Sequence, residues 1–559
     1  MYNLLDKKWL IGIRKDNTTE LASIRDCIIK DYADVKSPDF HGYHFYVYDY
    51  LIIRLLSTIT ADILITAAER FPEDYEDSID HYIITEMKNG KQSELFKRNA
   101  EFYFEKHHDR FELFDNTHPF MQFPVTDING KEDMMMKLNP LAPANSGRLF
   151  PESLHSRKRN QEHSIIGFCD CTLKKNDIAT KVKDQFVVTP QEAAHVVLYL
   201  ASVQPGVGSG NKNALVGNAY VWETLIGQSL YETVLLNMPI SGYLIDDEEP
   251  KDFGRPVWRW DSVKKKEEQI MINGKIKLLE GIFFPSRMIH MSYNGKSVTI
   301  AGSSIPKVLN DLFDPIRNMW AIKYEPHALI AQIKDTDKEE PKNPYRKLSP
   351  GDSLWLLMAA TAQTKQTKLQ EKRGKKVTDI LMSAGASHHM QELASSEALN
   401  GIIQIRYHYR MADSKWVYYR TGVVEGKIPE SLLKEPIRQN YLCRMEQYIT
   451  STKLTLKKQC KIYLANTTNN PTRIPNKEVL NKIQTGMYEK AFMDSIQNTF
   501  CGEHSFLYEI SAAEDFEQVY DVWKRKIKQE ALNQFSKLMD PTRMPVFWHC
   551  YEQLKKQCS

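Results

Sequence analysis

The amino-acid sequence predicts an α+β protein in which a large mixed N-terminal globular domain, residues 1–425, is followed by a C-terminal four-helix bundle, residues 435–559. Two observations lead to this prediction. The chain has 559 residues, more than a single hydrophobic core usually serves. The hydropathy pattern also changes near residue 425: β-branched runs and turn signals are mixed with helical runs before it, and helical spacing prevails after it.

Two apolar segments of the N-terminal part are predicted to be helices. The stretch over residues 50–68 is the most apolar in the chain, but it contains Arg54 and Asp62. Charges at the centre of a bilayer are costly, so this stretch is interpreted as a buried core helix and no membrane contact is expected. The second segment, AAHVVLYLASV over residues 193–203, comes directly before a glycine-rich stretch.

A β-hairpin is predicted at the end of the N-terminal part. The segments IIQIRYHYR and WVYYRTGVV are rich in β-branched and aromatic residues, which favour strands, and they flank residues 411–415. These five residues are therefore expected to form an exposed tip. The polar, lysine-rich segment over residues 363–376 is predicted to be a surface loop.

The C-terminal part is predicted to hold four amphipathic helices. Apolar residues recur at helical spacing, and prolines separate the segments. Asn476 and Ser511 are predicted helix N-caps, and Ser511 with Glu514 fits a capping box. The helices are expected near residues 441–464, 479–500, 516–538 and 546–556.

Composition favours a folded cytoplasmic protein. Hydrophobic residues make up 42% of the chain and charged residues 26%, and the net charge of +3 is close to neutral for this size. A nucleic-acid partner would therefore need local basic clusters. The eight cysteines are scattered and the N-terminus lacks a basic region followed by an apolar run, so the reducing cytoplasm is the expected location.

Two surface features point to a ligand, and each has a plainer reading. The glycines of PGVGSG, residues 205–210, let a backbone approach a ligand closely, but neither a P-loop nor a dinucleotide fingerprint is complete, so a flexible connector is an equal alternative. The run Arg157, Lys158 and Arg159 suits phosphate contacts, although a solvated loop would have the same composition.

No complete catalytic or metal-binding pattern can be assembled from the sequence. His107, His108 and Asp109 resemble part of a metal-dependent phosphohydrolase site, but the further ligands of such a site are not identifiable. The cysteines of Cys169-Asp170-Cys171 lack a second pair at zinc spacing. We expect no metal, no cofactor and no enzymatic activity. A metal-dependent nuclease using His107, His108 and Asp109 remains the alternative.

Several phrases, taken in order, resemble the large subunit of the type I-E CRISPR Cascade surveillance complex, the CasA family. The opening NLLDKKWL, the motif HPFMQ at residues 118–122, the loop PGVGSG and the segment GQSLYETVLLNM at residues 227–238 follow the family's order. Weaker likenesses continue to Glu325-Pro326-His327. The resemblance spans roughly residues 3 to 330.

The resemblance implies that the chain recognises the PAM of a target DNA duplex from the minor groove while guide RNA pairs with one strand. The glycine loop and a hairpin wedge carry this role in the family. The family's wedge glutamine matches Asp413 here, and since a carboxylate repels phosphates, either the register is shifted by one or two positions or Met411 or Lys415 takes the role. The family's PAM-contacting lysine falls near residues 293–296, where Lys296 is the candidate. The implied PAM- and DNA-binding residues are Gly206, Val207, Gly208, Ser209, Gly210, Asn294, Lys296, Met411, Ala412, Asp413, Ser414 and Lys415.

The resemblance also implies the partners of an antiviral defence complex. These are the 5′ handle of the CRISPR guide RNA, target double-stranded DNA with a PAM, the other Cascade subunits, and an effector helicase-nuclease that is recruited after R-loop formation. A purely structural scaffold subunit that does not touch DNA remains a further alternative. The implied loop that docks on guide RNA and backbone subunits contains Asn145, Arg148, Leu149 and Phe150, with Arg157, Lys158 and Arg159 close behind.

Overall fold

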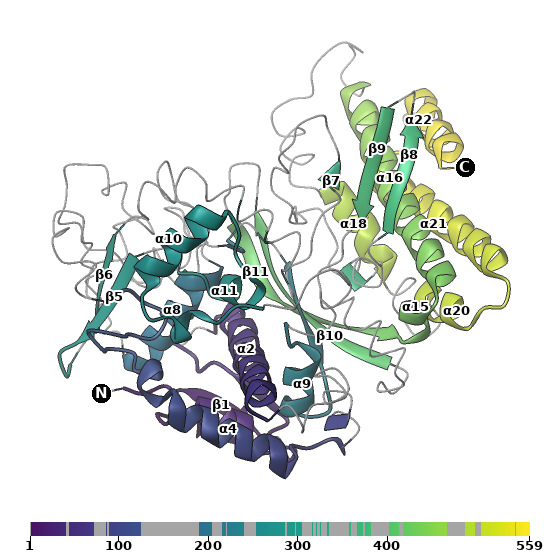
Figure 1. Cartoon of the computed structure of the whole chain (residues 1–559). Coiled ribbons are helices and arrows are strands. Elements are labelled where there is room, and N and C mark those ends of the chain that lie inside the picture. Colours follow the sequence, from purple (N-terminus) through teal and green to yellow (C-terminus); the bar gives the residue numbers. More distant parts are fainter. Residues whose placement is uncertain are drawn as a thin grey trace, which may run out of the picture.

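The structure is a computed structural model in which helices and sheets are mixed, as predicted (Figure 1). It describes residues 2–40, 44–71, 85–86, 89–124, 189–203, 215–217, 219, 221–239, 253–285, 288–296, 298–303, 316, 320, 325, 333–334, 357–358, 366–372, 375–381, 402–412, 418–466, 487–497, 505–542 and 544–558.

Helix α2, Tyr46–Arg70, forms the centre of the N-terminal part, and the prediction of a buried helix there is confirmed. It is long and apolar enough to cross a membrane, but 89% of its most apolar window is buried inside the protein. Its polar residues Arg54 and Asp62 have no exposed surface. Helices α1 (Ile24–Ile29), α4 (Glu94–Lys106), α8 (Pro190–Ser202) and α9 (Leu230–Leu236) pack around it.

The two buried charges of α2 are both paired. Arg54 donates from Nη1 to Glu325 Oε1 at 2.7 Å and from Nη2 to Glu325 Oε2 at 3.0 Å, and it also binds the carbonyl of Ile282. Asp62 accepts hydrogen bonds from Tyr103 at 2.6 Å and from Arg259 at 2.8 Å. Buried charges need such partners, so α2 can lie in the core because later parts of the chain supply them.

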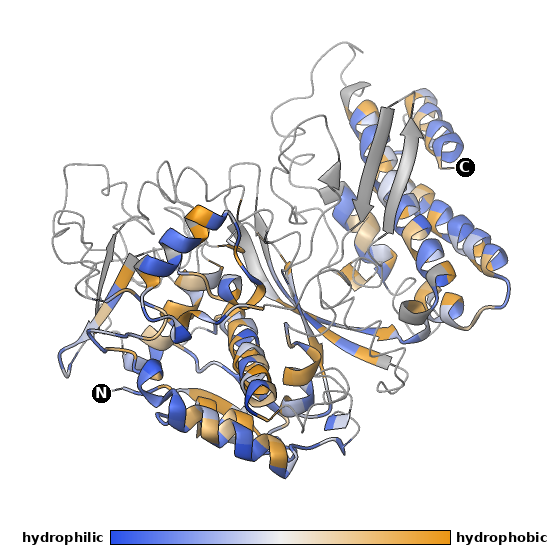
Figure 2. Cartoon of the chain, in the orientation of Figure 1, coloured by the Kyte–Doolittle hydropathy of each residue, from blue (hydrophilic) through white to orange (hydrophobic). Residues whose placement is uncertain are grey.

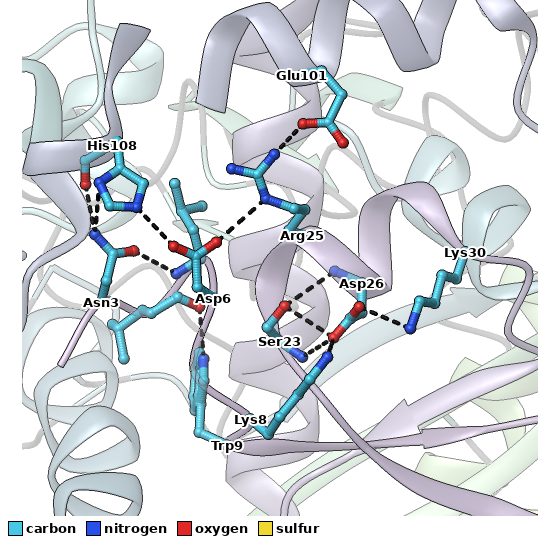
Figure 3. Close-up of polar contacts among 12 residues, drawn as sticks. Asn3, Asp6, Lys8, Trp9, Ser23, Arg25, Asp26, Lys30, Glu101 and His108 are labelled. Carbon is cyan, nitrogen blue, oxygen red and sulfur yellow. Dashed lines mark hydrogen bonds and ion pairs between the residues drawn. The ribbon is translucent and has the colours of Figure 1, made fainter. Parts of the chain in front are cut away.

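The N-terminal residues form a small antiparallel sheet against this core. Its strand order is β2 (Thr19–Ala22), β1 (Leu10–Ile13) and β3 (Asp34–Lys36). The side chain of Ser23 caps α1 in a capping box with Asp26. Asp26 also binds Lys8 and Lys30 (Figure 3). Burial opposes ionisation of Asp26, but these partners outweigh it and hold its pKa well below the ordinary value.

The predicted hairpin is confirmed as β10 (Ile402–Ala412) paired antiparallel with β11 (Tyr418–Pro429). A third strand, β4 (Val221–Ile226), pairs with the other edge of β10. One prediction about the tip is wrong. Met411 and Ala412 belong to β10 and pair with Arg420 and Tyr418, so the ladder extends past the predicted strand end.

A two-stranded sheet and a three-stranded sheet complete the described sheets. Strands β5 (Met288–Tyr293) and β6 (Val298–Ser303) form an antiparallel hairpin. The segment predicted as a loop over residues 363–376 instead contributes strand β8 (Gln366–Lys372) and the start of β9 (Lys375–Leu381), with β7 (Ile333–Lys334) on the far edge of β9. That prediction relied on polar composition, which strands of an antiparallel hairpin can share.

The C-terminal part is helical. Helices α16 (Pro436–Asn466), α18 (Met487–Ser495), α21 (Phe516–Leu538) and α22 (Met544–Gln557) pack on one another. Two short helices, α15 (Ser431–Lys434) and α20 (Phe506–Ala512), contact strand β11. Strands β10 and β11 extend from the N-terminal part toward the C-terminal helices (Figure 1). Hydrophilic and hydrophobic residues alternate along α21 and α22, as amphipathic packing requires (Figure 2).

The helix starts differ from the predicted caps. Asp515 caps α21 by accepting a hydrogen bond from the backbone of Gln518 at 3.0 Å. Ser511 lies inside α20 and bonds to the carbonyl of Tyr508, so its predicted role as an N-cap is wrong. Asn476 lies outside the described residues.

The remaining short helices follow the glycine-loop region along the chain. Helices α10 (Val263–Asn273) and α11 (Leu278–Ile282) precede β5. Gly281 in α11 lies against the indole of Trp320, where an added Cβ would come within 2.1 Å of ring atoms. Only glycine permits this close approach of the helix to the ring.

Candidate nucleic-acid interface

Most residues of the predicted interface lie outside the described residues. This holds for the glycine loop, for the guide-docking loop and for the centre of the wedge. The residues concerned are Gly206, Val207, Gly208, Ser209, Gly210, Asn145, Arg148, Leu149, Phe150, Arg157, Lys158, Arg159, Asp413, Ser414 and Lys415.

The structure does describe the approach to the glycine loop. Helix α8 is capped by Thr189 in a capping box with Glu192 and begins with Pro190, which suits the first helical turn. His195 of this helix is fully buried and packs on Trp9 with ring centroids 4.8 Å apart. Burial lowers the pKa of His195 to about 4. The last helical residue, Ser202, comes shortly before the predicted loop and is fixed in the core.

Asn294 and Lys296 lie at the exposed turn of the β5–β6 hairpin. Asn294 Oδ1 accepts a hydrogen bond from the backbone of Lys296 at 3.0 Å, and Tyr293 Oη donates to the carbonyl of Gly295 at 2.9 Å. Gly295 has a φ of 86°, the left-handed conformation that favours glycine. The turn therefore has a defined shape and presents a lysine to solvent.

The base of this hairpin is attached to the HPFMQ motif. Phe123 donates its backbone N–H to the carbonyl of Ile289 at 2.9 Å, and the side-chain amide of Gln122 accepts from the backbone of Met291 at 2.6 Å. The Nδ1 atom of His290 lies 3.0 Å from the carbonyl of Phe123. Burial lowers the pKa of His290.

An aromatic stack lies beside the same hairpin. The rings of Phe114 and Tyr293 stack with centroids 5.5 Å apart, and Tyr2 packs against Phe114 with centroids 6.2 Å apart. Burial raises the pKa of Tyr2 to about 12. Tyr293 keeps 42% of its surface exposed, so part of this aromatic ring near the turn remains accessible to a partner.

The second described element of the predicted interface is the hairpin β10–β11, which carries the predicted wedge. Arg406 of β10 binds Asp34 of β3 at 2.9 Å and Glu425 of β11 at 3.0 Å. These contacts fix the hairpin to the N-terminal sheet. Met411 and Ala412 lie at the end of β10, whereas Asn294 and Lys296 lie on a separate sheet.

The three residues of the nuclease alternative do not form one site. The Nε2 atom of His108 lies 2.7 Å from Asp6 Oδ2, and Asn3 donates to the backbone carbonyl of His108 at 2.7 Å (Figure 3). The ring of His107 packs against Tyr103, and burial lowers its pKa to about 4. Asp109 is exposed, with a carboxylate oxygen 3.6 Å from the Nε atom of Arg110. His108 thus joins the N-terminal segment to the residues after α4.

Within the described ranges, no group of three or more His, Cys, Asp or Glu side chains is placed to hold a metal ion. A small cavity lies beside the HPFMQ motif, between Arg110, His118 and Trp260. Arg110 lines this cavity and donates to His118 Nδ1 at 3.0 Å and to the carbonyl of Trp260 at 3.4 Å.

Sequence reasoning missed the residues that attach the two hairpins. Gln122, His290 and Arg406 were not selected from the sequence. For Gln122 a signal existed, because it ends the HPFMQ motif on which the family resemblance relied. Nothing in the sequence pairs Arg406 with Asp34, which lies 372 positions earlier in the chain.

The chain resembles known proteins along its whole length. The family model of the CRISPR-associated protein Cse1 matches residues 3–534. No curated protein sequence matches. Among solved structures, CasA of Thermus thermophilus has a TM-score of 0.61 at 17% identity, covering 100% of this chain and 99% of that one. Cse1 of Thermobifida fusca has a TM-score of 0.64 at 15% identity, covering 100% and 98%.

A chain from a structure described as a CRISPR RNA-guided surveillance complex has a TM-score of 0.55 at 14% identity, covering 100% of this chain and 99% of that chain. At such identities the structural likeness shows a shared fold. The family model, which covers nearly all of the chain, shows the family and confirms the resemblance predicted from the sequence motifs. The chain belongs to the Cse1 family of CRISPR-associated proteins.

Proposed function

We propose that this chain is the non-catalytic DNA- and RNA-binding large subunit of a type I-E Cascade complex. The observation that carries the proposal is the match of the Cse1 family model to residues 3–534. The similarity to a chain of a CRISPR RNA-guided surveillance complex supports guide RNA and other Cascade subunits as partners. The subunit recognises the PAM, aids R-loop formation and recruits the effector helicase-nuclease, in the cytoplasm.

In this proposal the PAM is contacted from the minor groove by Gly206, Gly208 and Gly210, together with Val207 and Ser209. Residues without large side chains allow a backbone to reach base edges, which larger ones would obstruct. The fixed end of α8 supports this role, because a loop that starts from a buried helix end has a defined origin.

In this proposal two hairpins also contact the DNA. Asn294 and Lys296 contact DNA from the exposed β5–β6 turn, where the lysine ammonium favours phosphate. The end of β10, with Met411 and Ala412, leads to the wedge of Asp413, Ser414 and Lys415 that separates the strands. A carboxylate at the wedge repels phosphate, which places the attractive charge on Lys415.

The guide-docking loop binds the 5′ handle of the guide RNA and neighbouring subunits. Phe150 stacks on an unpaired base, and Arg157, Lys158 and Arg159 contact phosphates. We also infer that residues 1–425 and 435–559 act as two domains, the second a four-helix bundle. Packing among α16, α18, α21 and α22 supports this division.

The test compares two targets for the assembled complex. Gly208→Asp adds a side chain and a negative charge where the backbone would approach the groove, so it is expected to weaken binding of PAM-containing duplex by more than about tenfold. Binding of single-stranded target, which needs no PAM, should change little. Affinities are measured by electrophoretic mobility shift over a titration of complex.

Gly274→Asp is the matched control, since Gly274 caps α10 with nothing within 4 Å of an added Cβ, and aspartate is among the residues that best tolerate its left-handed φ of 64°. It should leave both affinities unchanged. Equal duplex affinity for the Gly208→Asp complex and the wild type would refute the glycine-loop assignment. Metal-dependent DNA cleavage by the purified chain, abolished by His108→Ala, would refute the non-catalytic role.

A further inference from the structure

We infer that Gln122 is a positioning residue that fixes the orientation of the β5–β6 hairpin and, through it, of Asn294 and Lys296 toward duplex DNA. The inference rests on the proposed function for its DNA part, whereas the attachment of the hairpin is a feature of the protein alone. Gln122 does not reach the turn itself. It acts through the backbone of β5.

Gln122 uses both ends of its side-chain amide. Its Nε2 atom donates to the carbonyls of Leu113 at 2.8 Å and Phe120 at 3.2 Å, and its Oε1 atom accepts from the backbone of Met291 at 2.6 Å. The Nε2 group thus binds the side chain to the segment that follows α4, and the Oε1 atom binds it to strand β5 of the hairpin. An apolar side chain would make none of these bonds, and a carboxylate would lose both donated ones.

The contact lies on the free edge of β5. Strand β6 covers one edge, and on the other the Met291 N–H and the Ile289 carbonyl bind Gln122 and Phe123. Among the described residues, these two bonds continue the ladder of β5 onto the HPFMQ motif. Removing the Gln122 amide leaves the bond from Phe123 to Ile289 and the contact between His290 Nδ1 and the Phe123 carbonyl. Both of these are made to Phe123, so the hairpin can turn about that residue.

Burial makes the contact specific. Gln122 is 2% exposed, Met291 is fully buried, and Ile289 is 3% exposed. A hydrogen bond in such a site is costly to leave unmade, because water does not replace the lost partner. The neighbouring Met121 has a φ of 54°, a conformation that non-glycine residues adopt only when the surroundings enforce it. The motif therefore holds the amide of Gln122 in one orientation.

The bond between Gln122 and Met291 sets the direction in which the β5–β6 turn points, but it does not set the conformation of the turn. The two hydrogen bonds within residues 293–296 are local, so they persist whichever way the hairpin leans. Met291 is buried, and the exposed part of the hairpin begins at the next residue, Ser292. Fixing Met291 therefore sets where the Lys296 ammonium is presented.

The first test measures amide hydrogen exchange in the assembled complex. Gln122→Met keeps the side-chain length and removes the polar atoms. We expect faster exchange in β5 and β6, with α16 and α21 unchanged. Gln459→Met is the matched control, since Gln459 is also 2% exposed but lies in α16. It should not affect exchange in the hairpin. Wild-type exchange in β5 of the Gln122→Met variant would overturn the inference.

The second test is a double-mutant cycle on DNA binding. Gln122→Met alone should weaken PAM-containing duplex by about fivefold and single-stranded target by less than about twofold. In a complex that already carries Asn294→Ala and Lys296→Ala, adding Gln122→Met should have no further effect on duplex affinity. Additive losses would mean that Gln122 acts by another route, and would overturn the inference.

The DNA-binding variants distinguish a wrong positioning role for Gln122 from a wrong assignment of the DNA contact. If Asn294→Ala with Lys296→Ala weakens duplex binding but Gln122→Met does not, the positioning role is wrong and the proposed function stands. If the turn variants leave duplex affinity unchanged, the proposed DNA contact of this hairpin is wrong, and the positioning role toward DNA is refuted with it.

Discussion

An ion pair beside α2 and an ion pair between the C-terminal helices differ in their exposure to solvent. Around α2, the ion pair between Arg54 and Glu325 has no exposed side-chain surface on either partner. Between α16 and α21, the pair between Arg444 and Glu517 leaves 37% and 53% of the two side chains exposed. One pair is enclosed in the core and the other is solvated on a helix surface.

The difference matters because water screens one pair and not the other. The guanidinium of Arg444 also lies over the rings of Tyr441 and Tyr520, at 4.7 and 4.3 Å from their centroids, so its contacts are shared with solvent and aromatic faces. Arg54 has only protein partners around it. We expect the protein to respond sharply to loss of a charged group in the Arg54–Glu325 pair, and weakly to loss of one in the Arg444–Glu517 pair.

The largest effect is expected for Arg54→Met. It leaves the Glu325 carboxylate buried without its cation, which destabilises by about 3–5 kcal/mol. Urea unfolding followed by circular dichroism measures the change. The double variant Arg54→Met with Glu325→Met should recover most of the loss, because no unpaired charge remains. A double variant as unstable as Arg54→Met would contradict the account based on the buried charge.

Lowering the pH is expected to reduce the free energy of unfolding by a smaller amount than Arg54→Met does. His195 and His408 are buried, and burial lowers the pKa of each to about 4 from the ordinary 6.5. Between these values the unfolded chain binds protons that the folded protein does not, so stability falls as the pH is lowered from 6.5 toward 4. Each histidine contributes about 2 kcal/mol of this loss at pH 5.

His195→Phe tests the acid effect, since the position is surrounded by Trp9, Phe40 and Tyr48 and accepts an aromatic ring. The stability difference between pH 7 and pH 5, measured by urea unfolding, should shrink by about 2 kcal/mol in the variant. His44, whose pKa is raised by its hydrogen bond to Asp49, acts in the opposite sense and is unchanged by the substitution. An unaltered pH dependence would show that His195 is not a source of it.

The smallest effect is expected for Glu517→Gln. Hydrogen bonds from Arg444 and Tyr441 lower the pKa of Glu517 to about 2, but the carboxylate is exposed and screened. The urea midpoint of the variant should therefore match that of the wild type. A clear drop in the midpoint would mean that this surface pair stabilises the helices as strongly as the buried one, and would remove the contrast between the two regions.

The sequence predicted the elements whose patterns are local. The buried helix of residues 50–68, the strands around residue 411 and the C-terminal helices are confirmed because hydrophobic periodicity and strand composition act over a few neighbouring residues. The cap at Ser511 was placed wrongly, because the residue that accepts the hydrogen bond from the start of α21 is Asp515, four residues later, while Ser511 lies inside α20.

The candidate interface was less predictable. Motifs in order were sufficient to identify the family, and Asn294 and Lys296 do lie on an exposed turn. The contacts that attach the hairpins could not be predicted from the sequence, because the bond from Met291 to Gln122 spans 169 positions and the pair of Arg406 with Asp34 spans 372. No local pattern carries such a pairing.

The buried ion pair of α2 has a consequence for how the protein is made. Glu325 follows Arg54 by 271 positions, so α2 leaves the ribosome long before its counter-charge is synthesised. Until then a core closed around α2 would enclose an unpaired guanidinium, which opposes compaction of the early chain. We therefore expect the N-terminal core to close around α2 only after the segment that carries Glu325 has emerged from the ribosome.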